Sequence, residues 1–175
     1  MEDEKLHYIV VTGIVIKDGK YLITRRSKEE AAFPGLWTVP GGKLRKSDYT
    51  TSPKDTADHW YNILEKLLER EIEEEVGLKV KNIRYLLSLA YIRSDNIPTV
   101  IISLYCDYDA GKIEISDELI DYAWVTVDEL DQYEFVPGLR EEIELVDKVL
   151  KESKQYTWRG KYDNASDESL RDGRK

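Results

Sequence analysis

The stretch L-E-K-L-L-E-R-E-I-E-E-E-V-G-L, from Leu64 to Leu78, decides what kind of fold this chain can adopt. Its apolar residues recur with a stride of four, which predicts one apolar face of a helix: Leu64, Leu68, Ile72 and Val76. Gly77 follows at the point where a left-handed C-terminal cap is expected to end the helix. The stretch is therefore predicted to be the last part of a helix that packs against a core.

Some acids of this helix fall where apolar residues are expected. On a helical wheel, Glu71 and Glu75 lie within the apolar stripe and Glu74 lies on its edge. Carboxylates are rarely buried unpaired on such a face, and residues three or four apart are neighbours on a helix. The three acids are expected to converge on one point. The alternative interpretation is a charged helix end that projects past the core into solvent.

A metal ion would explain these acids. Three carboxylates at the C-terminal end of a helix oppose its macrodipole, which favours cations there. A hard divalent cation removes that cost and the burial cost, because Mg²⁺ favours carboxylate oxygens together with several retained waters. The rest of the chain has to decide between a metal site and a solvated acidic face.

Length and composition exclude several classes of protein. At 175 residues, one domain is expected, and the net charge of −9 argues against nonspecific binding of nucleic acid or anionic membranes. The single Cys106 excludes an internal disulfide and a cysteine-based zinc site, and fits a reducing compartment. No long apolar run suggests a membrane span, and the acidic start M-E-D-E-K is unlike a secretory signal. We expect a soluble, cytoplasmic protein.

Patterns of apolar and β-branched residues predict a sheet. The first segment is apolar on both faces at its centre, which is typical of a buried central strand, and the predicted strands are Tyr8–Lys17, Lys20–Arg25, Val80–Arg93, Thr99–Tyr108 and Tyr122–Val127. Trp37 and Val39 form one face of a short strand, which Pro40 and a glycine pair then interrupt. A turn is also predicted at Asp109–Lys112.

Helix signals complete the order of elements. Arg45–Ser52 is polar and predicted to be loop, and Ser52-Pro53 offers an N-cap and a first helical position, so one helix is predicted to run unbroken to Val76. Pro137 opens a last amphipathic helix. Beyond it apolar residues thin out, so we predict one domain over residues 1–152 and a polar tail over 153–175.

The combination of a sheet, a Pro-Gly-Gly turn and R-E-I-E-E-E-V-G-L resembles the Nudix hydrolase family. The signature of that family is Gly-x5-Glu-x7-Arg-Glu-U-x-Glu-Glu-x-Gly-U, where U is a bulky aliphatic residue. Its second half is matched in full from Arg70 to Leu78. Counting six residues on from Gly42 reaches Asp48 rather than Glu, and 21 residues rather than seven separate Asp48 from Arg70. The resemblance, which covers about residues 6–150, implies an insertion of about 14 residues in the box.

The resemblance implies a fold and an activity. The fold is an α/β/α sandwich around a mixed β-sheet. The activity is metal-dependent hydrolysis of a pyrophosphate bond in a nucleoside diphosphate linked to another group, such as a nucleotide or a nucleotide sugar, with Mg²⁺ as the cofactor and Mn²⁺ as the second choice. Homodimers are frequent in the family. The alternative is a Nudix-fold domain that senses a nucleotide without turnover, but the three retained acids favour an enzyme.

The resemblance also implies roles for individual residues. The implied metal ligands are the three helix acids, a backbone carbonyl before the box and one distal acid, namely Glu71, Glu74, Glu75, Gly41 and Glu118, with Asp121 as a competing distal acid. Glu71 or Glu74 is the expected general base, unless a later acid serves, and Arg70 is expected to orient one of them by ion pairing.

Phosphate contacts are predicted at three basic residues, Arg25, Arg26 and Lys43, because guanidinium and ammonium groups suit phosphate. The alternative for the arginine pair is a solvated strand end. Trp37 is predicted to be core, whereas Tyr8 and Tyr91 are weak candidates for stacking on a base. The sequence leaves the substrate open. The insertion is predicted to lengthen the catalytic helix at its N-terminal end and to border the active-site cleft.

Overall fold

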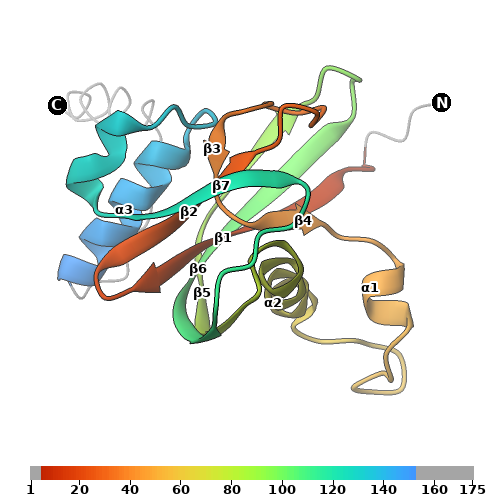
Figure 1. The fold of residues 1–175 in the computed structure, drawn as a ribbon. Coiled ribbons are helices and arrows are strands. Elements are labelled where there is room, and N and C mark those ends of the chain that lie inside the picture. The colour runs from red at the N-terminus through yellow and green to blue at the C-terminus, as the bar shows by residue number, and fades with distance from the viewer. Residues whose placement is uncertain (1–4, 153–175) are drawn as a thin grey trace, which may run out of the picture.

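The computed structural model describes residues 5–152 and shows a sheet between helices (Figure 1). Its elements in chain order are β1 Tyr8–Lys17, β2 Lys20–Arg26, β3 Trp37–Thr38, β4 Gly41–Lys43, α1 Ser47–Thr50, α2 Ile63–Val76, β5 Leu78–Ile92, β6 Pro98–Gly111, β7 Leu119–Val125, the 3₁₀ helix η1 Val127–Gln132 and α3 Leu139–Glu152. No helix within residues 5–152 is long and apolar enough to cross a membrane.

Strand β1 lies at the centre of the sheet, as its apolar pattern on both faces predicts. It pairs parallel with β6 and antiparallel with β2 and β4, which makes the sheet mixed. The main order is β3-β2-β1-β6-β5, and β7 pairs with β2. Residues on alternate faces of β1 then belong to two separate cores, with Val11 and Val15 in one and Ile14 in the other.

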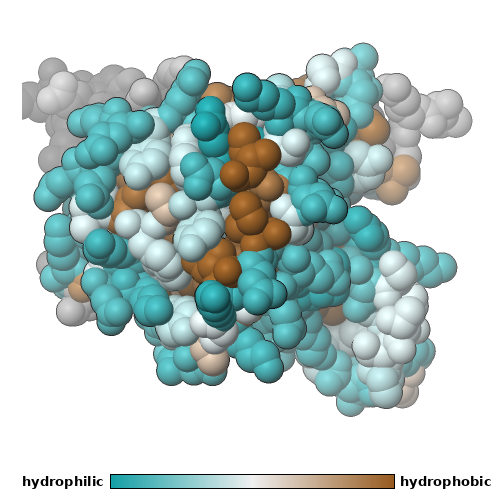
Figure 2. All heavy atoms as spheres, viewed as in Figure 1, coloured by the Kyte–Doolittle hydropathy of each residue, from teal (hydrophilic) through white to brown (hydrophobic). Residues whose placement is uncertain are grey.

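The two cores define two helical layers. In the core that contains Val11 and Val15, α2 packs on one face of the sheet. The buried residues of the helix there are Leu67, Leu68, Ile72 and Val76. In the core that contains Ile14, α3 packs on the other face of the sheet through Leu139, Ile143 and Val146. The predicted α/β/α sandwich is therefore confirmed, and Figure 1 shows the two helices on opposite sides of the strands. Between them, hydrophobic side chains gather near the middle of an otherwise mostly hydrophilic face (Figure 2).

The prediction of a helix starting at Ser52-Pro53 is wrong, because α2 begins only at Ile63. The preceding residues form the short helix α1 and then a loop whose backbone is held by side chains. The hydroxyl of Thr56 accepts hydrogen bonds from the amides of Asp58 and His59, which offers the chain an alternative to helix. Asn62 then adopts a left-handed conformation with φ 55°, which separates this loop from α2.

Two other boundaries differ from the prediction. Strand β6 continues to Gly111, so most of the turn predicted at Asp109–Lys112 is strand. The Pro-Gly-Gly segment, predicted to be a turn, is also partly strand. Its residues Gly41–Lys43 form β4, which pairs with β1. A Cβ added at Gly41 would lie 2.3 Å from the carbonyl oxygen of Val11, so only glycine allows this close pairing. The predicted tail, residues 153–175, lies outside the described residues.

Candidate active site

The C-terminal turns of α2 present the three acids that the sequence singled out. The buried Leu68, Ile72 and Val76 fix the rotation of the helix. The side chain of Glu71 is therefore only 13 % exposed, whereas that of Glu74 is 58 % exposed. Gly77 ends the helix with φ 71°, as predicted.

Arg70 connects these acids to the segment between β4 and α2. Its Nη2 lies 2.7 Å from Oε1 of Glu71 and 3.3 Å from Oδ1 of Asp48, and its Nη1 lies 2.6 Å from Oε2 of Glu74. A guanidinium fork shared among three carboxylates restricts where each can lie. Asp48 is itself fixed, because its Oδ2 accepts a hydrogen bond from the amide of Arg45 at 2.6 Å.

Glu75 is held against β4. The amide of Gly41 donates a hydrogen bond to its Oε2 at 3.2 Å. Burial, together with the nearby charges of Glu71 and Glu118, raises the pKa of Glu75 from an ordinary 4.5 to about 8, although the Gly41 amide and Arg26 act in the opposite direction. A half-buried carboxylate among other acids is a site at which bound positive charge is strongly favoured.

Glu71 lies directly against the backbone of Gly42. A Cβ added at Gly42 would lie 2.2 Å from the carboxylate carbon of Glu71, so the absence of a side chain there makes room for the acid. Burial raises the pKa of Glu71, and the neighbouring Arg70 opposes that rise. The glycine pair and α2 thus form one unit, in which the backbone of β4 positions two of the acids.

A cavity of about 350 Å³ lies on the α3 side of the same chain segment. Its lining is mostly apolar, and consists of Thr12, Phe33, Thr38, Val39, Leu89, Tyr91, Ile101, Val136, Pro137, Leu139 and Glu142. Val39 lines the cavity, and Gly41, two residues further along the chain, donates its amide hydrogen bond to Glu75. A short piece of backbone therefore joins the cavity to the acids of α2.

The model of the NUDIX domain matches residues 7–146 of this sequence. This chain belongs to the Nudix hydrolase family. The nucleoside triphosphatase NudI of Escherichia coli strain K12 is 24 % identical over 147 residues, covering 78 % of this chain and 94 % of that protein. The 8-oxo-dGTP diphosphatase of Buchnera aphidicola subsp. Schizaphis graminum is 30 % identical over 127 residues, covering 72 % and 82 %.

A solved structure agrees with the fold of this Nudix domain. The MutT NUDIX hydrolase from Burkholderia pseudomallei superposes with a TM-score of 0.64 at 22 % identity, covering 81 % of this chain and 99 % of that one. The family match and the two hydrolase relatives confirm the prediction that the chain is a Nudix pyrophosphohydrolase.

The residues of the Nudix box fit a divalent cation by their chemistry. Within residues 5–152 no three acids, histidines or cysteines form a ready-made metal cluster, and Arg70 pairs with both Glu71 and Glu74. Carboxylates and a backbone carbonyl are nevertheless the oxygen ligands that Mg²⁺ prefers. The hydroxyl of Ser116 is buried without a hydrogen-bond partner among the described residues. The backbone amide of Ser116 donates a hydrogen bond to the backbone carbonyl of Glu75.

The predicted phosphate contacts of the Nudix domain are not equivalent in the structure. Arg26 lies close enough to Glu75 to lower its pKa, although its guanidinium also contacts Glu30 at 2.7 Å. Arg25 donates from Nε to the carbonyl of Gly35 at 2.9 Å. Lys43 is exposed, with its Nζ 5.7 Å from the centre of the Tyr8 ring. Of the three, Arg26 is the one whose charge shifts the pKa of Glu75.

The other predicted residues also differ in where the structure places them. Glu118 lies near Glu75, since its charge raises the pKa of that carboxyl, whereas Asp121 accepts a hydrogen bond from the amide of Tyr122. Trp37 packs edge-on against Tyr133 at 4.9 Å in the core, as expected. Tyr91 lines the cavity.

Sequence reasoning missed Glu142, which is buried in the cavity wall. The signal was present, because Glu142 lies three residues after Leu139 and four before Val146, on the apolar stripe of the last helix. On a helical wheel Glu142 falls within the apolar stripe of its helix, as Glu71 and Glu75 do in theirs.

Ala substitutions at the glycine pair are expected to have different effects. Gly41→Ala drives a Cβ into the backbone of β1, so we expect it to lower the free energy of unfolding by about 2 kcal/mol or more. Gly42→Ala meets the movable end of the Glu71 side chain, so we expect near-normal stability and at least about a tenfold lower kcat. Urea unfolding and hydrolysis assays on both variants check this, and equal loss of stability in both would contradict it.

The metal-free Nudix domain is expected to lose stability as pH rises, through Glu75. Its folded pKa is about 8, above the unfolded 4.5, so the folded state holds a proton that the unfolded state releases between these values. Near pH 4.5 the wild-type protein and Glu75→Gln should have about the same free energy of unfolding. At pH 9 the wild-type value should be lower by about 2–4 kcal/mol. Urea unfolding in a chelator measures this difference, and a difference independent of pH would contradict the assignment.

Proposed function

We propose that this Nudix domain hydrolyses, with Mg²⁺ or Mn²⁺, a pyrophosphate bond in a nucleoside diphosphate linked to another group. The observation that carries the proposal is that one short backbone segment runs from the cavity to the acids of α2. One segment of backbone contributes Val39 to an apolar cavity and, two residues on, Gly41 to the acids of α2. A volume of about 350 Å³ suits a small planar group such as a nucleobase, and the acids are then within one short segment of the attached phosphates.

We propose that Glu71, Glu74 and Glu75, with the carbonyl of Gly41 and the side chain of Glu118, hold the metal ion. When bound, such an ion offsets the charge of the pyrophosphate and lowers the pKa of a bound water. Arg26 lies near these acids and binds phosphate, with Arg25 and Lys43 as further contacts. Arg70 positions Glu71 through the 2.7 Å ion pair.

We assign the role of general base to Glu71. Its carboxylate is 13 % exposed and burial raises its pKa, whereas Glu74 is 58 % exposed. A carboxylate with a raised pKa accepts a proton from an attacking water more readily at neutral pH than a fully solvated one does. Glu71 also lies against the backbone of Gly42, which fixes its direction.

The experiment is a substrate panel. Nucleoside triphosphates, 8-oxo-dGTP, dinucleoside polyphosphates and nucleotide sugars are incubated with the full chain, with Mg²⁺, with Mn²⁺ and with a chelator. We expect hydrolysis of at least one nucleotide that stops in the chelator. No metal-dependent hydrolysis of any compound would contradict the proposal and favour the nucleotide-sensing alternative. Pairing of two copies stays a prediction, and size-exclusion chromatography with light scattering tests it.

A further inference from the structure

The cavity wall contains one acidic side chain, Glu142, among mostly apolar neighbours. It lies in the first turns of α3, and its residue is only 8 % exposed. The hydroxyl of Ser103 donates a hydrogen bond to its Oε2 at 2.5 Å, and the hydroxyl of Thr12 donates to Ser103 at 3.4 Å. Both hydroxyls therefore direct their protons toward the carboxylate, which acts as the acceptor at the end of the chain.

A purely structural role explains this carboxylate poorly. Burial raises the pKa of Glu142, which shows that its charge is costly there, and only the Ser103 hydrogen bond opposes the rise. An apolar residue at this position would join α3 to the sheet without that cost. The N-terminal end of a helix favours a negative charge, so the position supports the charged form. A charged acceptor that lines a cavity, with one donor among the described residues, is suited to donors supplied by a ligand.

The geometry points to Glu142 as the specificity-determining residue for the base, which we infer to be of the guanine type. This inference rests on the proposed function of the cavity as the base site. A carboxylate only accepts hydrogen bonds. The guanine edge offers an imino N–H beside an amino group, which are two adjacent donors. Adenine and cytosine place a ring-nitrogen acceptor beside their amino group, and uracil flanks its single N–H with carbonyl oxygens, so each of these sets a lone pair against the carboxylate.

Binding of nucleoside monophosphates in a chelator tests the inference without turnover. Calorimetry on the wild-type chain should give a Kd for GMP about tenfold or more below those for AMP, CMP and UMP, because one hydrogen bond to a buried charge is worth about that factor. IMP lacks only the amino group of GMP, so its Kd should also be about tenfold higher than that of GMP. This comparison needs no variant.

The matched variants are Glu142→Gln and Glu141→Gln, which change neighbouring acids of α3. Glu141 is exposed and Glu142 is buried in the wall. We expect Glu142→Gln to remove most of the preference for GMP over AMP, and Glu141→Gln to leave it unchanged. Thermal melting of both variants identifies any loss of folding, in which case the wild-type comparison of GMP with IMP decides.

Two outcomes would overturn the inference. One is equal wild-type affinity for GMP and IMP, and the other is a preference for GMP that survives in folded Glu142→Gln. Neither depends on metal or on hydrolysis, so failure here is distinct from failure of the proposed function. A protein that hydrolyses nucleotides without preference for guanine would keep the function and lose only this role of Glu142.

Discussion

Glu71→Gln is expected to lower kcat for metal-dependent hydrolysis about a thousandfold, with the protein still folded. General bases contribute about 10² to 10⁴ in rate, and this carboxylate is also a proposed metal ligand. Gln keeps the shape of the side chain against Gly42 but loses the charge and the ability to take a proton. Steady-state hydrolysis of the best substrate of the panel at saturating Mg²⁺ measures the change.

The matched control is Glu73→Gln on the same helix. Glu73 is exposed and is two residues from Glu71, so its neutral variant should keep kcat within about twofold. Thermal melting in a chelator establishes that both variants are folded. A Glu71→Gln variant with wild-type kcat would remove Glu71 from the site, and an equal loss in both variants would indicate a general effect of charge.

Arg70→Lys is expected to lower kcat about tenfold to a hundredfold and to raise the Mg²⁺ concentration needed for half-maximal activity. The lysine ammonium keeps the charge but does not span Glu71, Glu74 and Asp48 as the fork does. Displacement of a catalytic group by about 1 Å costs about 10²-fold. Asp48→Asn removes the weakest of the three ion pairs, at 3.3 Å, so a loss of only about threefold is expected.

Arg140→Lys is the control for this prediction. Arg140 also contacts two carboxylates, Asp131 and Glu144, but it belongs to α3, which lies on the opposite side of the sheet from α2 (Figure 1). We expect unchanged kcat and an unchanged Mg²⁺ requirement. If Arg70→Lys changes the melting temperature but neither kinetic quantity, Arg70 has a structural role only.

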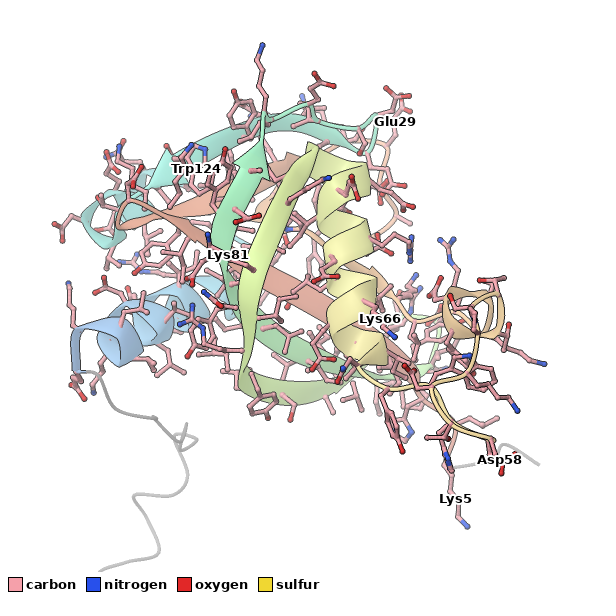
Figure 3. All side chains as sticks on the ribbon, turned by 90° about the horizontal axis from the view of Figure 1, so that it is seen from below. Lys5, Glu29, Asp58, Lys66, Lys81 and Trp124 are labelled. Carbon is pink, nitrogen blue, oxygen red and sulfur yellow. The ribbon has the colours of Figure 1, made fainter. Side chains whose placement is uncertain are left out.

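The segment between β4 and α2 shows the limit of local signals. Ser52-Pro53 is a good helix start by residue type, yet side chains such as Thr56 bind the backbone of the loop and α2 begins at Ile63. The loop projects beside the N-terminal half of α2, where Figure 3 labels Lys66 and Asp58. Lys66 lies 3.7 Å from Asp55 of the same loop. The segment thus lies on the α2 side of the sheet, and its Asp48 contacts Arg70. A role at the cleft stays a prediction.

By itself, the sequence determined the C-terminal half of α2, its cap at Gly77, the central strand β1 and the family, because each depends on the spacing of residues near one another in the chain. Only the tertiary structure decided which groups meet. The contact of Gly41 with Glu75 joins residues 34 positions apart, and that of Ser103 with Glu142 joins residues 39 positions apart. Such contacts depend on strand pairing and on how α2 and α3 pack across the sheet, which no local pattern specifies.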